Sequence, residues 1–248
     1  FIDQGKKEWI DQHHITITDR KTSSQDSNNN IIAPTFQPAL SFEEAASKCQ
    51  PEGVFPSDLL MTLTKLGYVK PTAVQSACIP IILSGRDVLV TASTGSGKTL
   101  AFCLPMVIHA CDQRHIEPGI DGPICVVLSP TRELALQTNK CVKSLLKVYS
   151  GARSIAVVGG DVKSTSKYEM TKDLQRGCEV IIATPGRMID MLSSKATNLT
   201  RVTIVILDEA DRMLEMGFEH QVRSIMQNTR PDRQTCMFSA TFRDRIRG

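Results

Sequence analysis

Two short motifs carry chemical groups that could act on a phosphorylated nucleotide. Residues 208–211 read Asp-Glu-Ala-Asp and follow an apolar run at 202–207, which is typical of a buried strand that ends in adjacent carboxylates. Upstream, residues 92–99 read Ala-Ser-Thr-Gly-Ser-Gly-Lys-Thr and follow another apolar run. A glycine-rich loop holds phosphates, and carboxylates can hold a magnesium ion and a water. The pair of motifs indicates a nucleoside triphosphatase.

The glycine-rich loop offers each part of a phosphate site. Its glycines let backbone N–H groups curl around phosphate oxygens at a helix N-terminus, which adds partial positive charge. Lys98 can reach the terminal phosphates, and the Thr99 hydroxyl can ligate Mg²⁺. The general pattern begins with Gly where this chain has Ala92. The predicted nucleotide contacts in the loop are Ala92, Ser93, Thr94, Gly95, Ser96, Gly97, Lys98 and Thr99.

The acid motif is predicted to divide two tasks between Asp208 and Glu209. Side chains alternate in direction along a strand end, so one carboxylate can hold the Mg²⁺ shell while the other orients the attacking water. Phosphoryl transfer needs mainly positioning and charge neutralisation, which this arrangement supplies. An acidic helix N-cap is the ordinary alternative. The position downstream of a phosphate loop favours the functional interpretation.

Residues 67–75, Gly-Tyr-Val-Lys-Pro-Thr-Ala-Val-Gln, are a candidate adenine site. Thr72 and Gln75 have the spacing of a capping box at a helix start, which is the structural alternative. In the functional interpretation the Gln75 amide donates to and accepts from the adenine edge, while Tyr68 stacks on the ring. Lys70 lies in the same segment and is included among the predicted nucleotide contacts.

Strands and helices alternate around these motifs. Strands are predicted at 87–91, 124–128, 153–158, 179–183, 202–207 and 235–238. Helices are predicted at 41–49, 56–66, 73–83, from the glycine loop to 110, 132–148, 164–175, 186–193 and 219–228. This alternation predicts an α/β fold, a parallel sheet with helices on both faces. The C-terminal ends of such strands share one edge, and the motifs fall there.

Composition sets broader limits. Residues 41–248 are expected to form one domain, and residues 1–40, which are polar at 22–30, a partly flexible extension with apolar anchors near Trp9. The net charge of +3 is too small to indicate a nucleic-acid partner by itself. No apolar run is long enough to suggest a membrane span, and the first residues do not resemble a signal peptide. Scattered cysteines indicate reduced thiols in a nuclear or cytoplasmic protein.

The motifs resemble those of the DEAD-box ATP-dependent RNA helicases over about residues 42–242. Residues 67–75 are similar to the family's Q motif, and 92–99 to its motif I, which usually begins with Ala. Phe42 is the candidate for the isolated upstream aromatic, with an implied insertion near 46–53. The resemblance implies the first RecA-like domain of a P-loop NTPase. The other matching segments are 130–135 (motif Ia), 159–160 (double glycine), 184–187 (motif Ib), 208–211 (motif II) and 239–241 (motif III).

The resemblance also implies roles for individual residues. Glu209 would be the catalytic carboxylate, with Asp208 and Thr99 on the magnesium ion and Lys98 on the phosphates. Asp211, Ser239 and Thr241 would couple nucleotide state to domain closure. Contacts to the RNA backbone would make binding independent of base sequence. The implied RNA contacts are Pro130, Thr131, Arg132, Gly159, Gly160, Thr184, Pro185, Gly186 and Arg187.

The same resemblance implies a second RecA-like domain, which is expected to be absent from this chain. That domain carries an arginine finger, and Arg243, Arg245 and Arg247 are not expected to replace it. Because an arginine finger contributes about 10³–10⁵ in rate, the chain alone is expected to bind ATP with little turnover. It is also expected to be a monomer. Two alternatives stay open: an ATP-dependent RNA clamp that nucleates an assembly and uses hydrolysis only for release, and a DNA-directed motor. Protein activators or ribonucleoprotein assemblies are the expected protein partners.

Overall fold

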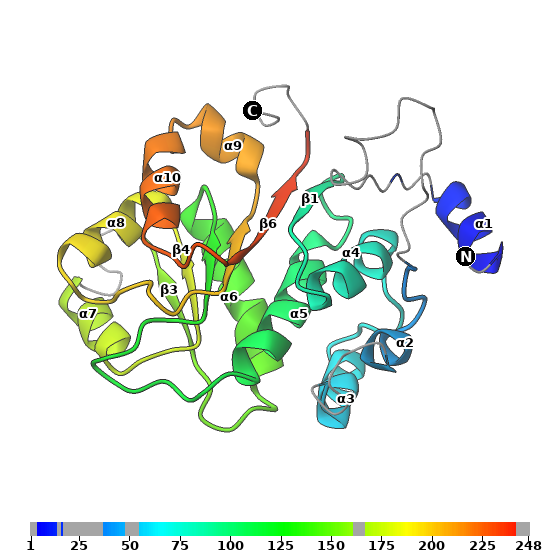
Figure 1. Cartoon of the computed structure of the whole chain (residues 1–248), viewed down its shortest axis with the longest axis horizontal. Coiled ribbons are helices and arrows are strands. Elements are labelled where there is room, and N and C mark those ends of the chain that lie inside the picture. Colours follow the sequence, from blue (N-terminus) through cyan, green and yellow to red (C-terminus); the bar gives the residue numbers. More distant parts are fainter. Residues whose placement is uncertain (1–3, 14–15, 17–36, 48–54, 161–166, 242–248) are drawn as a thin grey trace.

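A single parallel sheet organises the computed structural model, which describes residues 4–13, 16, 37–47, 55–160 and 167–241. Within these residues the strand order is β1-β6-β5-β2-β4-β3 (Figure 1). The predicted α/β fold with a parallel sheet is confirmed. The strands are β1 (Val88–Thr91), β2 (Cys125–Leu128), β3 (Ser154–Val157), β4 (Val180–Ala183), β5 (Ile204–Leu207) and β6 (Gln234–Ser239).

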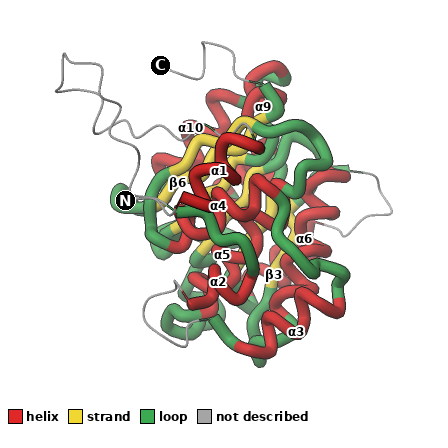
Figure 2. The backbone as a smooth tube through the Cα atoms, turned by 90° about the vertical axis from the view of Figure 1, so that its right-hand side faces the viewer, coloured by secondary structure: helices red, strands yellow, loops and turns green. Residues whose placement is uncertain are grey.

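Helices cover both faces of the sheet (Figures 1 and 2). One buried apolar cluster lies between the sheet and α2 to α6, and a second lies between the sheet and α7 to α10. The helices are α1 (Gln4–Gln12), α2 (Phe42–Ser47), α3 (Ser57–Lys65), α4 (Ala73–Leu83), α5 (Lys98–Cys111), α6 (Arg132–Leu146), α7 (Lys167–Gln175), α8 (Pro185–Ser193), α9 (Ala210–Glu215) and α10 (Glu219–Gln227).

Burial along the strands follows their place in the sheet. Every residue of the central strands β2, β4 and β5 is buried, as expected for apolar strands with helices on both sides. The edge strand β1 alternates between half-buried and exposed residues. Helix α5 is apolar on nearly all its surface and packs between α4 and α6, so its first residue, Lys98, stands on a rigid support.

The structure adds two helices that the sequence patterns did not predict. Helix α9 begins inside the acid motif, at Ala210. Helix α1 lies in the N-terminal extension, where Lys6 forms an ion pair with Glu44 of α2. Much of the extension, most of the implied insertion near 46–53, and Arg243, Arg245 and Arg247 lie outside the described residues. None of the helices that the structure describes is long and apolar enough to cross a membrane.

Candidate active site

The glycine loop and the acid motif meet at one edge of the sheet. They follow β1 and β5, and β6 lies between these two strands (Figure 1). The Ala92 N–H donates to the Ser239 carbonyl over 3.1 Å, which ties the loop to the end of β6. The Asp208 N–H donates to the Leu128 carbonyl over 2.9 Å, which fixes the acid motif against β2.

The glycine loop curls around the ammonium group of Lys98. Gly95 and Gly97 have φ angles of 78° and 94°, in the left-handed region that favours glycine, and Gly97 is the N-cap of α5. The Lys98 ammonium donates to the carbonyl oxygens of Ala92 and Ser93, and the Lys98 residue is 9% exposed. The loop therefore surrounds a fixed positive charge at the start of a helix, which suits a phosphate group.

Asp208 is a buried carboxylate, and one of its oxygens has no hydrogen-bond partner in the described part of the chain. The residue is 3% exposed, and its Oδ2 has no hydrogen-bond partner among the described residues. Burial raises the pKa of Asp208 to about 7, the charge of Glu209 adds to this, and Lys98 acts in the opposite direction. A buried carboxylate oxygen without a partner destabilises the folded state unless a cation or a hydrogen-bond donor binds it. The geometry fits a metal-ligating carboxylate.

Glu209 is held in an unusual backbone conformation. Its φ of 53° is left-handed, although it is not a glycine, and the residue forms the N-cap position of α9. Its carboxylate lies 3.3 Å from the Arg212 guanidinium, and the side chain is 24% exposed. Such strain costs about 1–3 kcal/mol and collects at functional sites. The acid motif therefore presents one buried and one accessible carboxylate.

Asp211 joins the acid motif to the residues after β6. Its Oδ2 accepts hydrogen bonds from the Thr241 N–H at 3.0 Å and from the Thr241 hydroxyl at 2.8 Å. The Ser239 hydroxyl donates to the Thr241 carbonyl over 2.6 Å. Burial acts to raise the pKa of Asp211, but the hydrogen bonds that its carboxylate accepts from Thr241 and from the Arg212 N–H outweigh it and lower the pKa. The structure thus brings together all three predicted coupling residues.

Gln75 connects the start of α4 to the glycine loop. Its side-chain oxygen accepts from the Thr72 N–H at 3.0 Å, as in a capping box, and its amide nitrogen donates to the Gly97 carbonyl at 3.1 Å. The Thr72 hydroxyl donates to the Ser96 carbonyl over 2.8 Å. A Cβ on Gly97 would lie 2.6 Å from the Gln75 amide nitrogen, so glycine is required at this close approach. Gln75 therefore forms the capping box of α4 and, in addition, a hydrogen bond to the glycine loop.

The other residues of the adenine segment are placed differently. Tyr68 is half-buried and packs against the apolar core, and burial raises its pKa, with further effects from Cys141 and Cys103. Phe42 is 3% exposed within the same core. Lys70 is exposed. Stacking of Tyr68 on adenine stays a prediction, since its ring serves the core in this structure.

Two arginines flank the double glycine that follows β3. The Arg132 guanidinium donates to the Gly159 carbonyl over 3.0 Å. A Cβ on Gly160, whose φ is 144°, would lie 2.7 Å from Arg132 Nη1, and a Cβ on Gly159 would lie 3.6 Å from Arg187 Nη2. Arg187 is also 3.8 Å from Asp190. Segments far apart in sequence therefore form one basic cluster at the same edge of the sheet.

The remaining predicted RNA contacts shape two helix N-termini beside this cluster. Thr131 caps α6 by accepting from the Leu134 N–H at 3.3 Å, and Thr184 holds the N-cap position of α8. Pro185 is the first residue of α8, where its missing N–H costs nothing. Pro130 is buried and Gly186 is exposed. Free N–H groups at these two helix starts suit phosphate oxygens.

Ser129 is a candidate that sequence reasoning missed. It is fully buried, and its hydroxyl has no hydrogen-bond partner among the described residues. It follows Leu128, which pairs with Leu207 in the parallel register, so Ser129 lies beside Asp208 on the neighbouring strand. A lone serine at a strand end carries no sequence signal. Its unpaired hydroxyl becomes visible only once β2 and β5 are known to be neighbours.

Comparisons with known proteins agree with this geometry. The family model for DEAD/DEAH box helicases matches residues 72–247. The chain is 52% identical over 192 residues to "ATP-dependent RNA helicase DDX42" of Gallus gallus, covering 77% of this chain and 20% of that protein. It is 56% identical over 187 residues to "Probable ATP-dependent RNA helicase DDX46" of Homo sapiens, covering 74% of this chain and 18% of that protein.

A solved structure gives the same result. The yeast DEAD-box splicing factor Prp28 superimposes with a TM-score of 0.75 at 35% identity, over 86% of this chain and 48% of that chain. The chain spans about a fifth of the length of the curated relatives above. The sheet, the glycine loop and the family match point to one conclusion: this chain belongs to the DEAD/DEAH box helicase family, as its N-terminal RecA-like domain.

Proposed function

We propose that this chain is the ATP-binding domain of an ATP-dependent RNA helicase, which hydrolyses ATP to unwind or remodel RNA. The observation that carries the proposal is the buried carboxylate of Asp208, whose Oδ2 has no hydrogen-bond partner among the described residues and which interacts electrostatically with Lys98 of the glycine loop. Relatives named as ATP-dependent RNA helicases support the same activity.

In this proposal the glycine loop binds the phosphates of ATP, and Asp208 and Thr99 hold Mg²⁺. Magnesium keeps several waters and takes only one or two protein carboxylates, so a dedicated protein cage is not needed. Within the described residues no group of three His, Cys, Asp or Glu side chains forms such a cage. Bound magnesium would neutralise charge on the phosphates. Lys98 would stabilise the same charge from the loop side.

Glu209 would orient and polarise the attacking water. Its carboxylate is more accessible than that of Asp208, and its left-handed backbone fixes the direction in which it leaves the strand. Gln75 would read the adenine edge with the hydrogen-bonding capacity left on its amide after its bonds to Thr72 and Gly97. Binding of adenine to Gln75 would then affect the position of the phosphate loop through the hydrogen bond from Gln75 to the Gly97 carbonyl.

RNA would bind across the basic cluster around the double glycine. Arg132, Arg187 and the N-termini of α6 and α8 offer positive charge and free N–H groups, which recognise the backbone and leave base sequence unread. We propose that a second domain of the full-length protein completes both the RNA surface and the ATP site, with Asp211 and Thr241 linking the two events. We further propose a nuclear or cytoplasmic location, with protein activators or ribonucleoproteins as partners.

The experiment is a steady-state ATPase assay with and without single-stranded RNA, on the 248-residue chain and on the full-length protein. RNA is expected to stimulate the full-length protein and barely affect the 248-residue chain, which should still bind ATP. Lys98→Ala in the full-length protein is the control for contaminating activity. An absence of RNA-stimulated, Lys98-dependent turnover in the full-length protein would refute the function. Strong stimulation of the short chain would refute the need for a second domain.

A further inference from the structure

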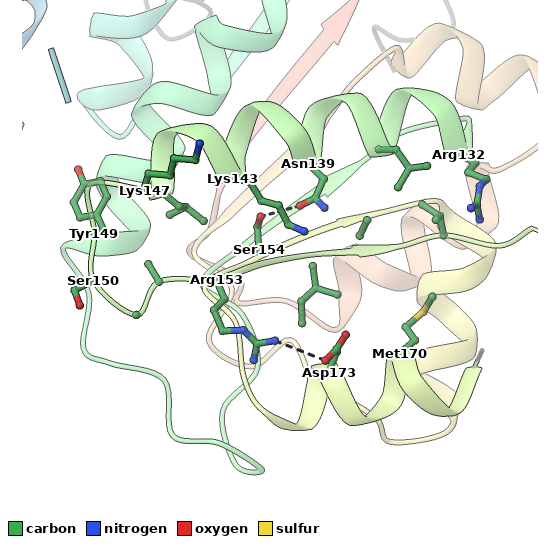
Figure 3. A pocket seen from close by; sticks show the side chains of 17 residues that line it. Arg132, Asn139, Lys143, Lys147, Tyr149, Ser150, Arg153, Ser154, Met170 and Asp173 are labelled. Atoms are coloured by element: carbon green, nitrogen blue, oxygen red, sulfur yellow. Dashed lines mark hydrogen bonds and ion pairs between the residues drawn. The ribbon is translucent and has the colours of Figure 1, made fainter. Parts of the chain in front are cut away.

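A groove with a volume of about 680 Å³ runs along the outer edge of β3 (Figure 3). Strand β3 is the last in the described sheet, and the groove lies between α6 on one side and α7 on the other. Of the residues proposed above for ATP and RNA, only Arg132 lines it. The groove is therefore a separate surface, which begins beside the basic cluster and extends along the strand away from it.

The floor of the groove is an open strand edge. The carbonyls of Arg153 and Val157 accept from N–H groups of Glu179 and Thr184, both over 3.1 Å, so these residues face β4. Backbone groups alternate sides along a parallel strand, so those of Ser154, Ala156 and Val158 face the groove. Within the described part of the chain no backbone hydrogen bond meets these outward groups. Such an edge is a template for a further strand.

The two walls of the groove differ in chemistry. On the α6 side, the Ser154 hydroxyl donates to Asn139 over 2.8 Å. On the α7 side, Ile155 and Met170 belong to the same apolar cluster. Successive side chains of a strand point to opposite faces. A strand added at this edge would therefore place alternate side chains against α6 and against apolar atoms of α7.

The α6 wall carries a pair of exposed lysines, Lys143 and Lys147, and neither forms an ion pair with any described residue. Arg153 adds a third cation, and Asp173, 3.8 Å from it, is the only acidic residue among the described residues that line the groove (Figure 3). Four helical residues rise about 6 Å, and two extended residues rise about 6.6 Å. Carboxylates two positions apart in an added strand would thus match the two lysines.

We propose that the β3 edge binds an extended segment of a partner protein by strand addition, and that this segment alternates acidic and apolar residues. The acidic side chains pair with Lys143 and Lys147, and the apolar side chains pack on Met170. The backbone of the segment bonds to Ser154, Ala156 and Val158. A peptide edge supplies both donors and acceptors in the required alternation, whereas RNA phosphates supply acceptors alone.

The first test uses a fluorescein-labelled synthetic peptide that alternates Glu and Val, added to the 248-residue chain and followed by fluorescence anisotropy. Two peptides are controls: one of the same composition with Glu and Val in separate blocks, and one of the same sequence with alternate backbone nitrogens methylated. The alternating peptide is expected to bind, with amide chemical-shift changes at Ser154, Ala156 and Val158, and both controls are expected to bind at least about tenfold more weakly. Equal binding of either control would overturn the proposal.

The second test separates this groove from general attraction to a basic surface. Lys143→Glu with Lys147→Glu is expected to weaken peptide binding by at least about tenfold. Lys140→Glu, on the same helix but outside the groove, is expected to change it less than about twofold. Equal weakening by Lys140→Glu would overturn the proposal. A uridine oligonucleotide that shifts the same three amides and loses binding with Lys143→Glu would show a nucleic-acid surface instead.

Discussion

Replacement of Asp208 by Asn is expected to stabilise the ligand-free protein at neutral and alkaline pH. The pKa of Asp208 is raised from 3.8 to about 7 by burial. The folded state therefore binds more protons than the unfolded state between these values, and the stability of the wild type falls as pH rises through that window. Above about pH 7 the full loss of unfolding free energy is present, because the buried carboxylate is then charged in the folded state.

The size of the effect follows from the raised pKa. One pKa unit corresponds to about 1.4 kcal/mol, so the rise at Asp208 corresponds to roughly 4 kcal/mol in total, of which roughly 3 kcal/mol develops between pH 5 and pH 8. The amide side chain of the Asp208→Asn variant does not titrate. The difference in unfolding free energy between variant and wild type should therefore grow by about that amount over this range.

The assay is urea unfolding of both proteins at pH 5, 6, 7 and 8 in magnesium-free buffer. Asp11→Asn, the same change from carboxylate to amide at an exposed residue of α1, is the matched control. A difference between Asp208→Asn and wild type that stays constant from pH 5 to pH 8 would refute the reasoning. Such a constant difference would mean that the Asp208 carboxylate is solvated in the ligand-free protein and is not destabilised by the absence of a cation.

Three further outcomes are expected. Glu209→Gln in the full-length protein should keep ATP and RNA binding but lower single-turnover hydrolysis by at least about 10²-fold, and wild-type rates would contradict its catalytic role. Gln75→Ala should weaken ATP binding by about 1–3 kcal/mol and reduce selectivity over GTP in a competition assay, and equal wild-type affinity for both nucleotides would contradict the adenine assignment. Gly160→Ala should weaken RNA binding without changing ATP binding, because its Cβ would lie 2.7 Å from Arg132 Nη1. Gly119→Ala is the control for backbone strain, because Gly119 has a left-handed φ but no atom of the described residues within 4 Å of an added Cβ. An equal loss of RNA affinity in the two variants would contradict a role for the contact between Gly160 and Arg132.

Sequence patterns predicted the sheet well because each strand is a short apolar run bounded by turn residues. The predicted range 73–83 matches α4 at both ends, and each predicted strand overlaps an observed one. Helix α9 was missed because only Asp208 and Glu209 separate it from β5, and Glu209 has a left-handed backbone conformation. A glutamate gives no indication in the sequence of a left-handed backbone, because the surrounding structure imposes this conformation. Strand order was also beyond reach, because it depends on contacts between distant segments.

The candidate site was predicted in its residues but not in its connections. The glycine loop, the acid motif and residues 239–241 were each readable from local pattern. The link from Gln75 to the Gly97 carbonyl was not, because a capping box explains the same spacing without the loop. Likewise, the unpaired hydroxyl of Ser129 depends on the pairing of β2 with β5. Spacing predicts local geometry, whereas these contacts depend on tertiary packing.

The burial of α5 has a consequence for motion. The helix begins at Lys98 and is packed on both sides, so its amides should exchange with deuterium only when the whole domain opens. In the glycine loop ahead of it, Ser93, Thr94 and Gly95 are exposed. Phosphates would thus sit against one of the slowest-moving parts of the protein. Nucleotide binding should therefore change amide hydrogen exchange in the loops around α5 and leave the exchange of α5 itself unchanged.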